Sequence, residues 1–439
     1  MQLWTRLKRS TLVRNTVWMF FGQGLGQVLR AVYFLIIPRA LGVEQYGAFV
    51  GVTSLVAILA PFAAGGSGGL IVKNVSRDKR VFGDYWGNAL LVSLVGGSAL
   101  AILTIAAARF IFSGNVPWLL VCLVAISDLF FSNVLDIGTQ AFQAFDLLAL
   151  TAKLSLVGNF MRIIGAVVLL LFFHHATAIS WAWCYLAASI VMAVIAMYWV
   201  SHKLGKPVLA FWRIKPELLE GGYFAVSMSS QTIYNDIDKT MLVRLSTLAS
   251  AGIYAAAYRL IDVAFMPIRS LLWAAYPNFF RHGANGLGAC TNYAKRLLLR
   301  AGLYSVGIGL VVFFGAPIVP LLLGSQYGLT VIALRWLAPL PLLKTLHYFV
   351  ANALTGAGLQ GVRTAVQVFV GVFNIGLNVW LIPAYSWRGA AWSSLASDGL
   401  LAIGLWLAVL ILCRRENNQK TRGKTTPLYT PELESEISA

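Results

Sequence analysis

Charged residues are scarce in this chain of 439 residues, and acidic residues are the scarcest. Asp and Glu number 16, and the four charged types together make up 11% of the sequence, against about 25% in an average soluble domain. Hydrophobic residues make up 59%, and the mean hydropathy is +0.75. A soluble fold of this composition would lack the polar surface needed to cover its core, so a lipid bilayer is the solvent that suits it.

Signatures of catalysis and cofactor binding are missing as well. The four cysteines lie in or beside apolar runs without metal-ligand spacing, and there is neither a P-loop nor a nucleophile elbow. A Gly-x-Gly-x-x-Gly match at 356–361 follows an apolar helix rather than a strand, which excludes the dinucleotide reading. We therefore expect no cofactor, no metal and no enzymatic activity. Nor do the 34 Lys and Arg indicate nucleic acid, because no basic stripe lies on a polar fold.

Long apolar runs are plentiful, and twelve are long enough to cross a bilayer, which takes about 20 residues. The runs are 15–37, 47–72, 87–111, 117–140, 154–173, 179–200, 222–245, 251–275, 301–323, 330–352, 365–383 and 391–413. Lys and Arg gather in every second connection, and the opposite side holds only Arg39, Arg109 and Arg388. Because basic loops stay in the cytoplasm, this alternation predicts a multi-pass inner-membrane protein with both termini cytoplasmic.

A weak internal repeat relates the two halves of the chain. It aligns Arg39 with Arg244, Gly47 with Gly252 and Phe49 with Tyr254. Six helices per half give both halves the same orientation. The sequence thus predicts an all-α integral membrane protein with about twelve transmembrane helices in two parallel six-helix lobes around a central cavity. We place the lobes at 1–200 and 222–413, a cytoplasmic linker at 201–221 and a disordered cytoplasmic tail at 414–439.

Basic residues also occur inside the predicted spans. A Lys or Arg at the bilayer centre costs about 2.5–3.5 kcal/mol, so it must pair, reach the interface or line a wet cavity. We predict that these cations outnumber the nearby acids and line a cavity for an anionic substrate, since guanidinium groups suit phosphate. The residues assigned to substrate binding are Arg30, Arg162, Lys239, Arg259, Arg269, Arg335 and Lys344.

Polar residues share helical faces with these cations. Those assigned to support the cavity or to bind a coupling ion are Gln23, Gln27, Asn159, Asn235, Asp238, Asp262, Asn374 and Asn378. Ion pairing that fixes helix packing is the alternative, and the spacings Asp236–Lys239 and Arg259–Asp262 fit it. In the second span, the glycine-rich segment 65–69 indicates a point of close packing or unwinding.

Three stretches resemble Wzx-type oligosaccharide flippases, in the superfamily of multidrug, oligosaccharide-lipid and polysaccharide exporters. They are Pro38-Arg-Ala-Leu-Gly42 with Tyr46-Gly-Ala-Phe49, Asp238-Lys-Thr-Met-Leu242 with Ala251-Gly-Ile-Tyr-Ala-Ala-Ala-Tyr-Arg259, and Asn374 and Asn378 with Leu381-Ile-Pro383 and Arg388-Gly-Ala-Ala-Trp392. The resemblance implies an undecaprenyl-pyrophosphate-linked oligosaccharide repeat unit as substrate, flipped by alternating access for O-antigen or other surface polysaccharide synthesis. It also implies protons or Na⁺ as coupling ion, and membrane lipids and the polysaccharide polymerase machinery as partners.

Two other classes stay open. A cation-coupled multidrug exporter of the same superfamily would favour buried acids over buried bases. A polytopic membrane glycosyl or acyl transferase would need a catalytic constellation near a membrane face. A lipid II flippase is a further relative, which commonly has two more helices than the twelve found here.

Overall fold

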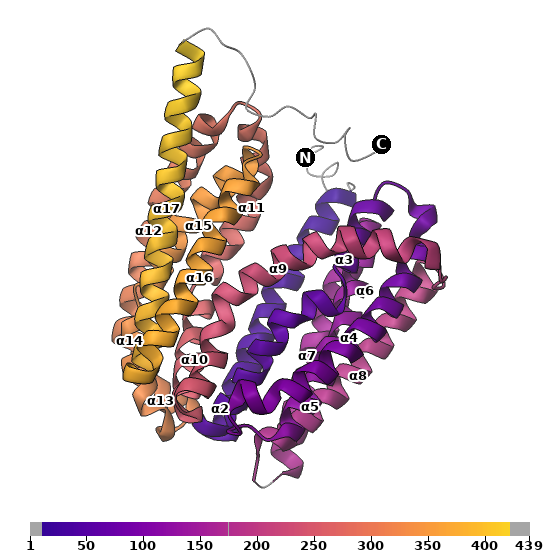
Figure 1. Ribbon diagram of the computed structural model, residues 1–439, viewed down its shortest axis with the longest axis vertical. Helices are drawn as coiled ribbons and strands as arrows, with labels where there is room; N and C mark the ends of the chain where they lie inside the picture. Colours follow the sequence, from indigo (N-terminus) through magenta and orange to yellow (C-terminus); the bar gives the residue numbers. More distant parts are fainter. Residues whose placement is uncertain (1–10, 174, 422–439) are drawn as a thin grey trace, which may run out of the picture. The chain divides into compact units, whose positions relative to one another are not determined.

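The structure, a computed structural model, describes residues 11–173 and 175–421, and every regular element in them is helical (Figure 1). The first helices are α2 (Thr11–Ala63), α3 (Ser67–Leu70), α4 (Phe82–Phe112), α5 (Trp118–Ile126), α6 (Asn133–Ala144), α7 (Leu148–Phe172) and α8 (Ala178–Lys203). They are followed by α9 (Phe211–Leu245), α10 (Leu248–Ala264), α11 (Met266–Gly283), α12 (Leu287–Gly315), α13 (Val319–Leu323), α14 (Gly328–Leu337), α15 (Leu340–Gly356), α16 (Gln360–Tyr385) and α17 (Trp387–Thr421). Short π-helical or 3₁₀ turns are η1 (Ile71–Val75), η2 (Lys79–Val81), η3 (Ser127–Ser132), η4 (Ala316–Ile318) and η5 (Ser325–Tyr327).

The described helices cover all twelve predicted spans. Eight helical segments are long and apolar enough to cross a membrane, and two further pairs qualify as bent spans: α10 with α11, at 49°, and η5–α14 with α15, at 45°. The long α2 breaks at Gly42, whose φ of 77° leaves the helical region, and so supplies the first two spans. The more polar α9 covers the seventh. The predicted all-α membrane fold with about twelve crossings is confirmed.

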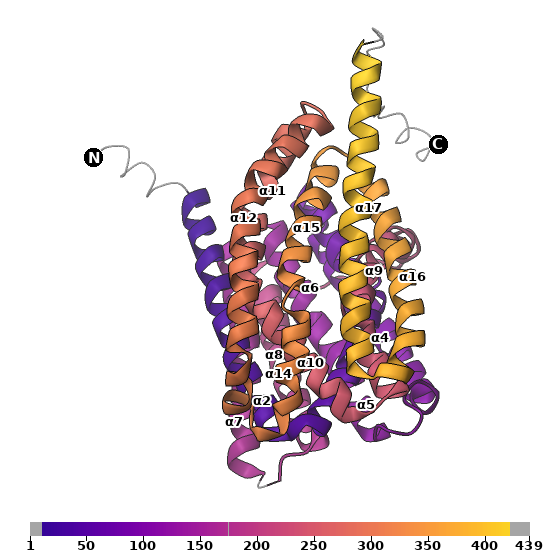
Figure 2. The same ribbon diagram turned by 90° about the vertical axis from the view of Figure 1, so that its left-hand side faces the viewer.

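Helix packing divides the chain into two compact units, which we describe separately. Unit 1 holds the described residues up to Ala256, with Pro317–Val331 and Asn378–Ala390; unit 2 holds Ala257–Ala316, Ile332–Leu377 and the described residues from Ala391. Within unit 2, α12 packs along α15, and α17 extends beyond its neighbours (Figure 2). Because α17 is helical to Thr421, residues 414–421 of the predicted disordered tail are helical, and the rest of that tail lies outside the described residues.

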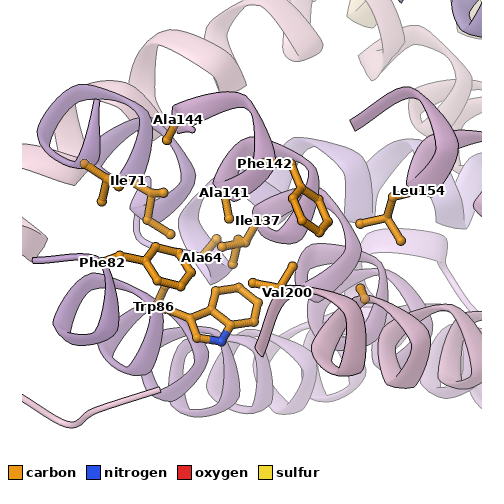
Figure 3. Packing of buried hydrophobic residues seen from close by; sticks show 13 residues of the cluster. Ala64, Ile71, Phe82, Trp86, Ile137, Ala141, Phe142, Ala144, Leu154 and Val200 are labelled. Carbon is orange, nitrogen blue, oxygen red and sulfur yellow. The ribbon is translucent and has the colours of Figure 1, made fainter. Parts of the chain in front are cut away.

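Aromatic packing holds α4, α6 and α8 of unit 1 together. Phe82 stacks on Trp86 with ring centroids 6.2 Å apart, and both rings are buried against Phe142 and Val200 (Figure 3). The Trp86 indole N–H lies 3.4 Å from the Ser201 hydroxyl, which gives the polar edge of the ring a partner. A buried core of this kind fixes the ends of three spans relative to one another.

The predicted linker 201–221 is structured and docked within unit 1. The Val208 N–H donates to the Gly83 carbonyl at 2.9 Å. The Asn88 amide exchanges two 3.0 Å hydrogen bonds with the backbone of Ala210, and Arg213 lies 3.4 Å from Asp84. Helix α9 already begins at Phe211. The linker is therefore clamped to the start of α4 rather than being a free connection.

The glycine-rich segment of the second span unwinds and packs closely, as predicted. Gly65 and Gly66 have φ of 56° and 67°, which end α2 and favour glycine. A Cβ on Gly66 would stand 2.0 Å from the carbonyl oxygen of Gly221 in α9, and one on Gly221 would stand 2.0 Å from that of Gly65. Only glycines allow the two backbones to approach this closely.

Candidate functional site

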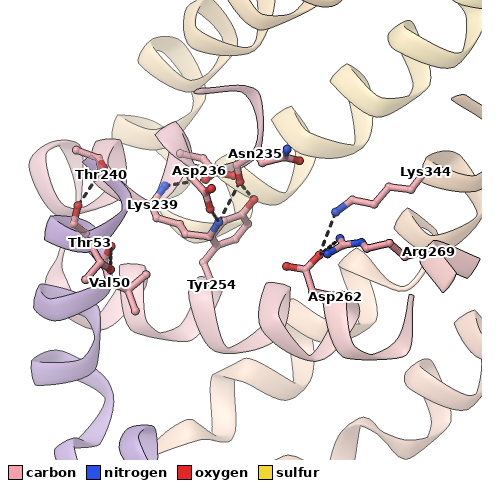
Figure 4. Close-up of polar contacts among 12 residues, drawn as sticks. Val50, Thr53, Asn235, Asp236, Lys239, Thr240, Tyr254, Asp262, Arg269 and Lys344 are labelled. Carbon is pink, nitrogen blue, oxygen red and sulfur yellow. Dashed lines mark hydrogen bonds and ion pairs between the residues drawn. The ribbon is translucent and has the colours of Figure 1, made fainter. Parts of the chain in front are cut away.

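A carboxylate shared by two cations forms the centre of the polar cluster in unit 2. Asp262, near the end of α10, lies 3.4 Å from the Lys344 ammonium on α15 and 3.7 Å from the Arg269 guanidinium on α11 (Figure 4). Lys344 is only 2% exposed, and its ammonium also stands 4.4 Å above the ring of Tyr258. The three groups come from three helices, of which α10 and α11 are bent by 49° at the break between them.

Arg259 contributes a further cation to α10. The spacing to Asp262 fits an ion pair, but that carboxylate is engaged by Lys344 and Arg269 instead. In the described part of the chain, half-buried Arg259 has no hydrogen bond, ion pair or ring contact. Arg259, Arg269 and Lys344 are three cations, whereas Lys344 interacts with two carboxylates, Asp262 and Asp398, so this cluster carries an excess of positive charge.

Three charged residues near the end of α9, in unit 1, have polar partners. The Lys239 ammonium contacts the Asp236 carboxylate at 2.5 Å and the Asn235 backbone carbonyl at 2.9 Å (Figure 4), which confirms the spacing argument for that pair. The buried Asp238 carboxylate accepts a hydrogen bond from the Tyr254 hydroxyl and another from the Lys239 backbone N–H. This tyrosine is the repeat partner of Phe49.

A second charge cluster of unit 1 involves Arg30 on α2 and Arg162 on α7. Both interact electrostatically with Asp136 on α6, and Arg162 also with Asp128 in η3. The Arg162 guanidinium stands 5.0 Å from the centre of the Tyr185 ring, and the Tyr185 hydroxyl donates to Asp128 at 2.8 Å. The expectation that these two arginines exceed the acids available to them is therefore wrong, because the acids come from the fourth span.

The remaining predicted site residues have varied surroundings. Exposed Arg335 directs its Nε toward the Phe313 carbonyl at 3.4 Å. Asn159 donates to Ser155 one turn earlier in α7, and buried Asn374 donates to Ser393 and Ser397 on α17. Asn378 is fully buried and Gln27 is half-buried. The side chain of Gln23 lies outside the described residues.

Unit 2 also contains a buried pair that was not among the predicted site residues. The imidazole Nε2 of His347 lies 2.8 Å from the Asp398 carboxylate, and the side chains are only 3% and 2% exposed. His347 follows Lys344 by one helical turn on α15, a spacing that places both on one face. That spacing, together with Asp398 in the last predicted span, was the feature of the sequence from which the pair could have been predicted. Within the described residues, no group of three or more His, Cys, Asp or Glu could hold a metal ion.

The fold is shared with transporters of the MOP superfamily. An inward-facing multidrug resistance MATE family transporter aligns with 91% of this chain and 96% of its own, at 16% identity and a TM-score of 0.75. The lipid II flippase MurJ, in an inward closed conformation, aligns with 90% of this chain and 87% of its own, at 14% identity and 0.71. A MOP superfamily transporter from Pyrococcus furiosus, whose binding pocket is described as having reverse polarity, aligns with 90% of this chain and 95% of its own. The sequence identity is 16% and the TM-score is 0.63.

These likenesses define the class: a multi-pass membrane protein with the fold of MOP-superfamily transporters. No curated protein matches the sequence significantly. Residues 12–282, more than half of the chain, match the family described as polysaccharide biosynthesis protein, and the protein belongs to that family. The family and the fold agree with the resemblance carried by the three sequence motifs.

Proposed function

We propose that this protein flips an undecaprenyl-pyrophosphate-linked oligosaccharide repeat unit across the bacterial inner membrane by alternating access. The product would supply the synthesis of O-antigen or another surface polysaccharide. The observation that carries the proposal is the excess of cations at this cluster. Arg269 and Lys344 share the carboxylate of Asp262, and Arg259, one helical turn before Asp262 on α10, has no acidic partner in the described chain. Inner-membrane placement, cytoplasmic termini, proton or Na⁺ coupling and transfer to the polymerase machinery belong to the same proposal.

A pyrophosphate suits this cluster because it supplies the missing negative charge. Cations inside a membrane protein are costly when they lack a counter-charge, and Arg binds phosphate oxygens with two parallel hydrogen bonds. Arg259 has no acidic partner in the described chain, while Arg269 shares Asp262 with Lys344. We therefore assign pyrophosphate binding first to Arg259 and Arg269.

The other predicted cations become secondary candidates for contacts with the substrate. Arg30, Arg162 and Lys239 interact with carboxylates of unit 1, so an anion would have to compete with those acids. Arg335 is exposed and interacts with Phe313. Their proposed roles are to orient the sugars or to hold the helices that change position during transport.

Binding of undecaprenyl pyrophosphate to purified protein in lipid nanodiscs tests the proposal, with undecaprenol as the uncharged reference ligand. We expect Arg259→Ala to weaken binding about 10-fold or more and Arg259→Lys to restore part of the affinity, as for a charge-assisted contact of about 1.5–3 kcal/mol. Arg281→Ala is the matched control, because Arg281 is exposed in the last turn of α11. Equal binding of both lipids, or unchanged binding by Arg259→Ala, would contradict the proposal.

A multidrug exporter is the second candidate. Asp238 and Asp398 are buried carboxylates within the spans, and such acids suit a cationic drug, which a MATE-type fold can accommodate. Drug sensitivity of a deletion strain distinguishes the two candidates. If the deletion strain is drug-sensitive but makes normal surface polysaccharide, and the reintroduced gene restores resistance, the exporter would be favoured over the flippase.

A further inference from the structure

The pair of His347 and Asp398 is separate from the arginines assigned to the pyrophosphate. It joins α15 to α17 through a 2.8 Å contact, and both side chains are almost completely buried. Ionisable groups at such positions within a membrane span are expensive to bury, and proton relays are one of their established uses. The partner here is a histidine, a residue that often serves as a proton carrier in proteins.

The charged cluster around Asp262 begins one helical turn away. Lys344 precedes His347 on α15, and its ammonium interacts electrostatically with both Asp262 and Asp398. The ionisable groups around the pair come from five helices: Lys344 and Tyr348 on α15, Tyr258 and Asp262 on α10, Arg269 on α11, Arg363 on α16, and Asp398 on α17. All of them belong to unit 2.

We propose that the His347–Asp398 pair is a proton-binding site, coupled through Lys344 to the site that binds the pyrophosphate of the substrate. When His347 carries the proton, its imidazolium balances the Asp398 carboxylate. Lys344 then pairs with Asp262, so the guanidinium groups of Arg269 and Arg259 can bind an anion. This inference deepens the proposed function and rests on it.

Loss of the proton changes the balance of the cluster. The Asp398 carboxylate then interacts with Lys344 without the competing imidazolium, which draws the ammonium away from Asp262. Asp262 in turn takes Arg269 as its main partner, so fewer positive charges face a ligand. The proton passes between His347 and water, and no other bond forms or breaks. Because linkage is reciprocal, binding of the anion must promote binding of the proton.

A purely structural role for the pair makes a different prediction. An ion pair that only holds α15 against α17 would affect folding, but the affinity for an anion would not depend on its protonation. The two roles are therefore separated by the pH dependence of ligand binding. Stability alone does not separate them.

The test is a titration of the protein in nanodiscs with undecaprenyl pyrophosphate at about pH 6 and pH 8. We expect about 5- to 10-fold tighter binding at the lower pH, within the usual range of coupling between sites. His347→Gln, which keeps an N–H donor for Asp398, should abolish most of this difference. His282→Gln, at the end of α11 where His282 stacks on Tyr293, is the matched control and should retain it, which also accounts for titration of the lipid phosphate.

Proton uptake by the unmodified protein is the second measurement, and it does not depend on the folding of a variant. Adding the lipid to protein in weak buffer should remove protons from solution beyond those taken up by the lipid itself. No such uptake, or the same pH dependence in His347→Gln as in the unmodified protein, would overturn the coupling while leaving the proposed function intact. No binding at either pH would instead contradict the proposed function.

Discussion

Gly47 and Gly252, which the internal repeat aligns with each other, pack directly against one another's helices in unit 1. A Cβ on Gly47 would stand 1.9 Å from the Leu248 carbonyl oxygen and 2.7 Å from the Gly252 nitrogen. A Cβ on Gly252 would stand 2.0 Å from the Val43 carbonyl oxygen. The repeated glycines are therefore explained by a backbone contact between α2 and α10 that no larger residue permits.

Replacement of either glycine by alanine should destabilise the protein. Gly47→Ala or Gly252→Ala forces the two helices apart, and overpacking of this kind costs about 1–3 kcal/mol or more. The measurement is the thermal unfolding of purified protein, followed by tryptophan fluorescence or size-exclusion chromatography. Gly376→Ala in α16 is the control, because a Cβ there meets nothing within 4 Å. Equal stability of all three variants would show that the contact is looser than described.

The charged residues of α7 and the fourth span should be energetically coupled. Arg162→Gln removes a cation that interacts with both Asp128 and Asp136, and because Arg162 and Asp128 are half-buried, we expect a loss of about 1–3 kcal/mol of stability. Adding Asp128→Asn removes one of the stranded charges, so the double variant should be more stable than Arg162→Gln alone. Thermal unfolding of Arg162→Gln, Asp128→Asn and the double variant measures this coupling. Strictly additive losses would indicate that Arg162 and Asp128 do not interact.

The clamp between the linker and α4 depends on Asn88. This side chain is fully buried and binds both the N–H and the carbonyl of Ala210, so Asn88→Ala leaves two backbone groups without these partners, at about 1–3 kcal/mol each. We expect a lower melting temperature and faster protease cleavage within 204–212. Asn418→Ala, at an exposed position of α17, should change neither. A cleavage rate that Asn88→Ala leaves unaltered would argue against the clamp.

The orientation in the membrane can be tested with single cysteines. In a variant whose four native cysteines, all free, are replaced, Ser76→Cys and Ser113→Cys place thiols at exposed positions on opposite predicted sides. The positive-inside rule predicts that a membrane-impermeant maleimide labels Ser113→Cys on intact cells, and Ser76→Cys only after the membrane is opened. The reverse pattern would invert the predicted topology.

The number of spans was predictable because the bilayer imposes it. Each crossing needs a long apolar run, and such runs can be recognised without knowledge of packing. Apolar length identified even the span formed by α10 and α11, because their 49° bend does not shorten the apolar run. The glycine break at 65–66 was also predictable, since few residues other than glycine tolerate its backbone conformation.

The partners of the intramembrane charges were predictable only within one helix. Asp236 and Lys239 are three residues apart on α9 and do pair. Lys344 and Asp262 are 82 residues apart in the sequence, and helical spacing contains no information about such a contact. The same reason explains why Asp128, Asp136 and Asp398 were overlooked as counter-charges.

By itself, therefore, the sequence determined the solvent, the helices and the crossings, because hydrophobic length and loop charge act locally along the chain. Only the tertiary structure decided which cations have acidic partners, since electrostatic energy depends on distances between helices. These distances reduced the residues first assigned to pyrophosphate binding from seven dispersed cations to Arg259 and Arg269. They also showed the buried His347–Asp398 pair, one helical turn from Lys344 on α15.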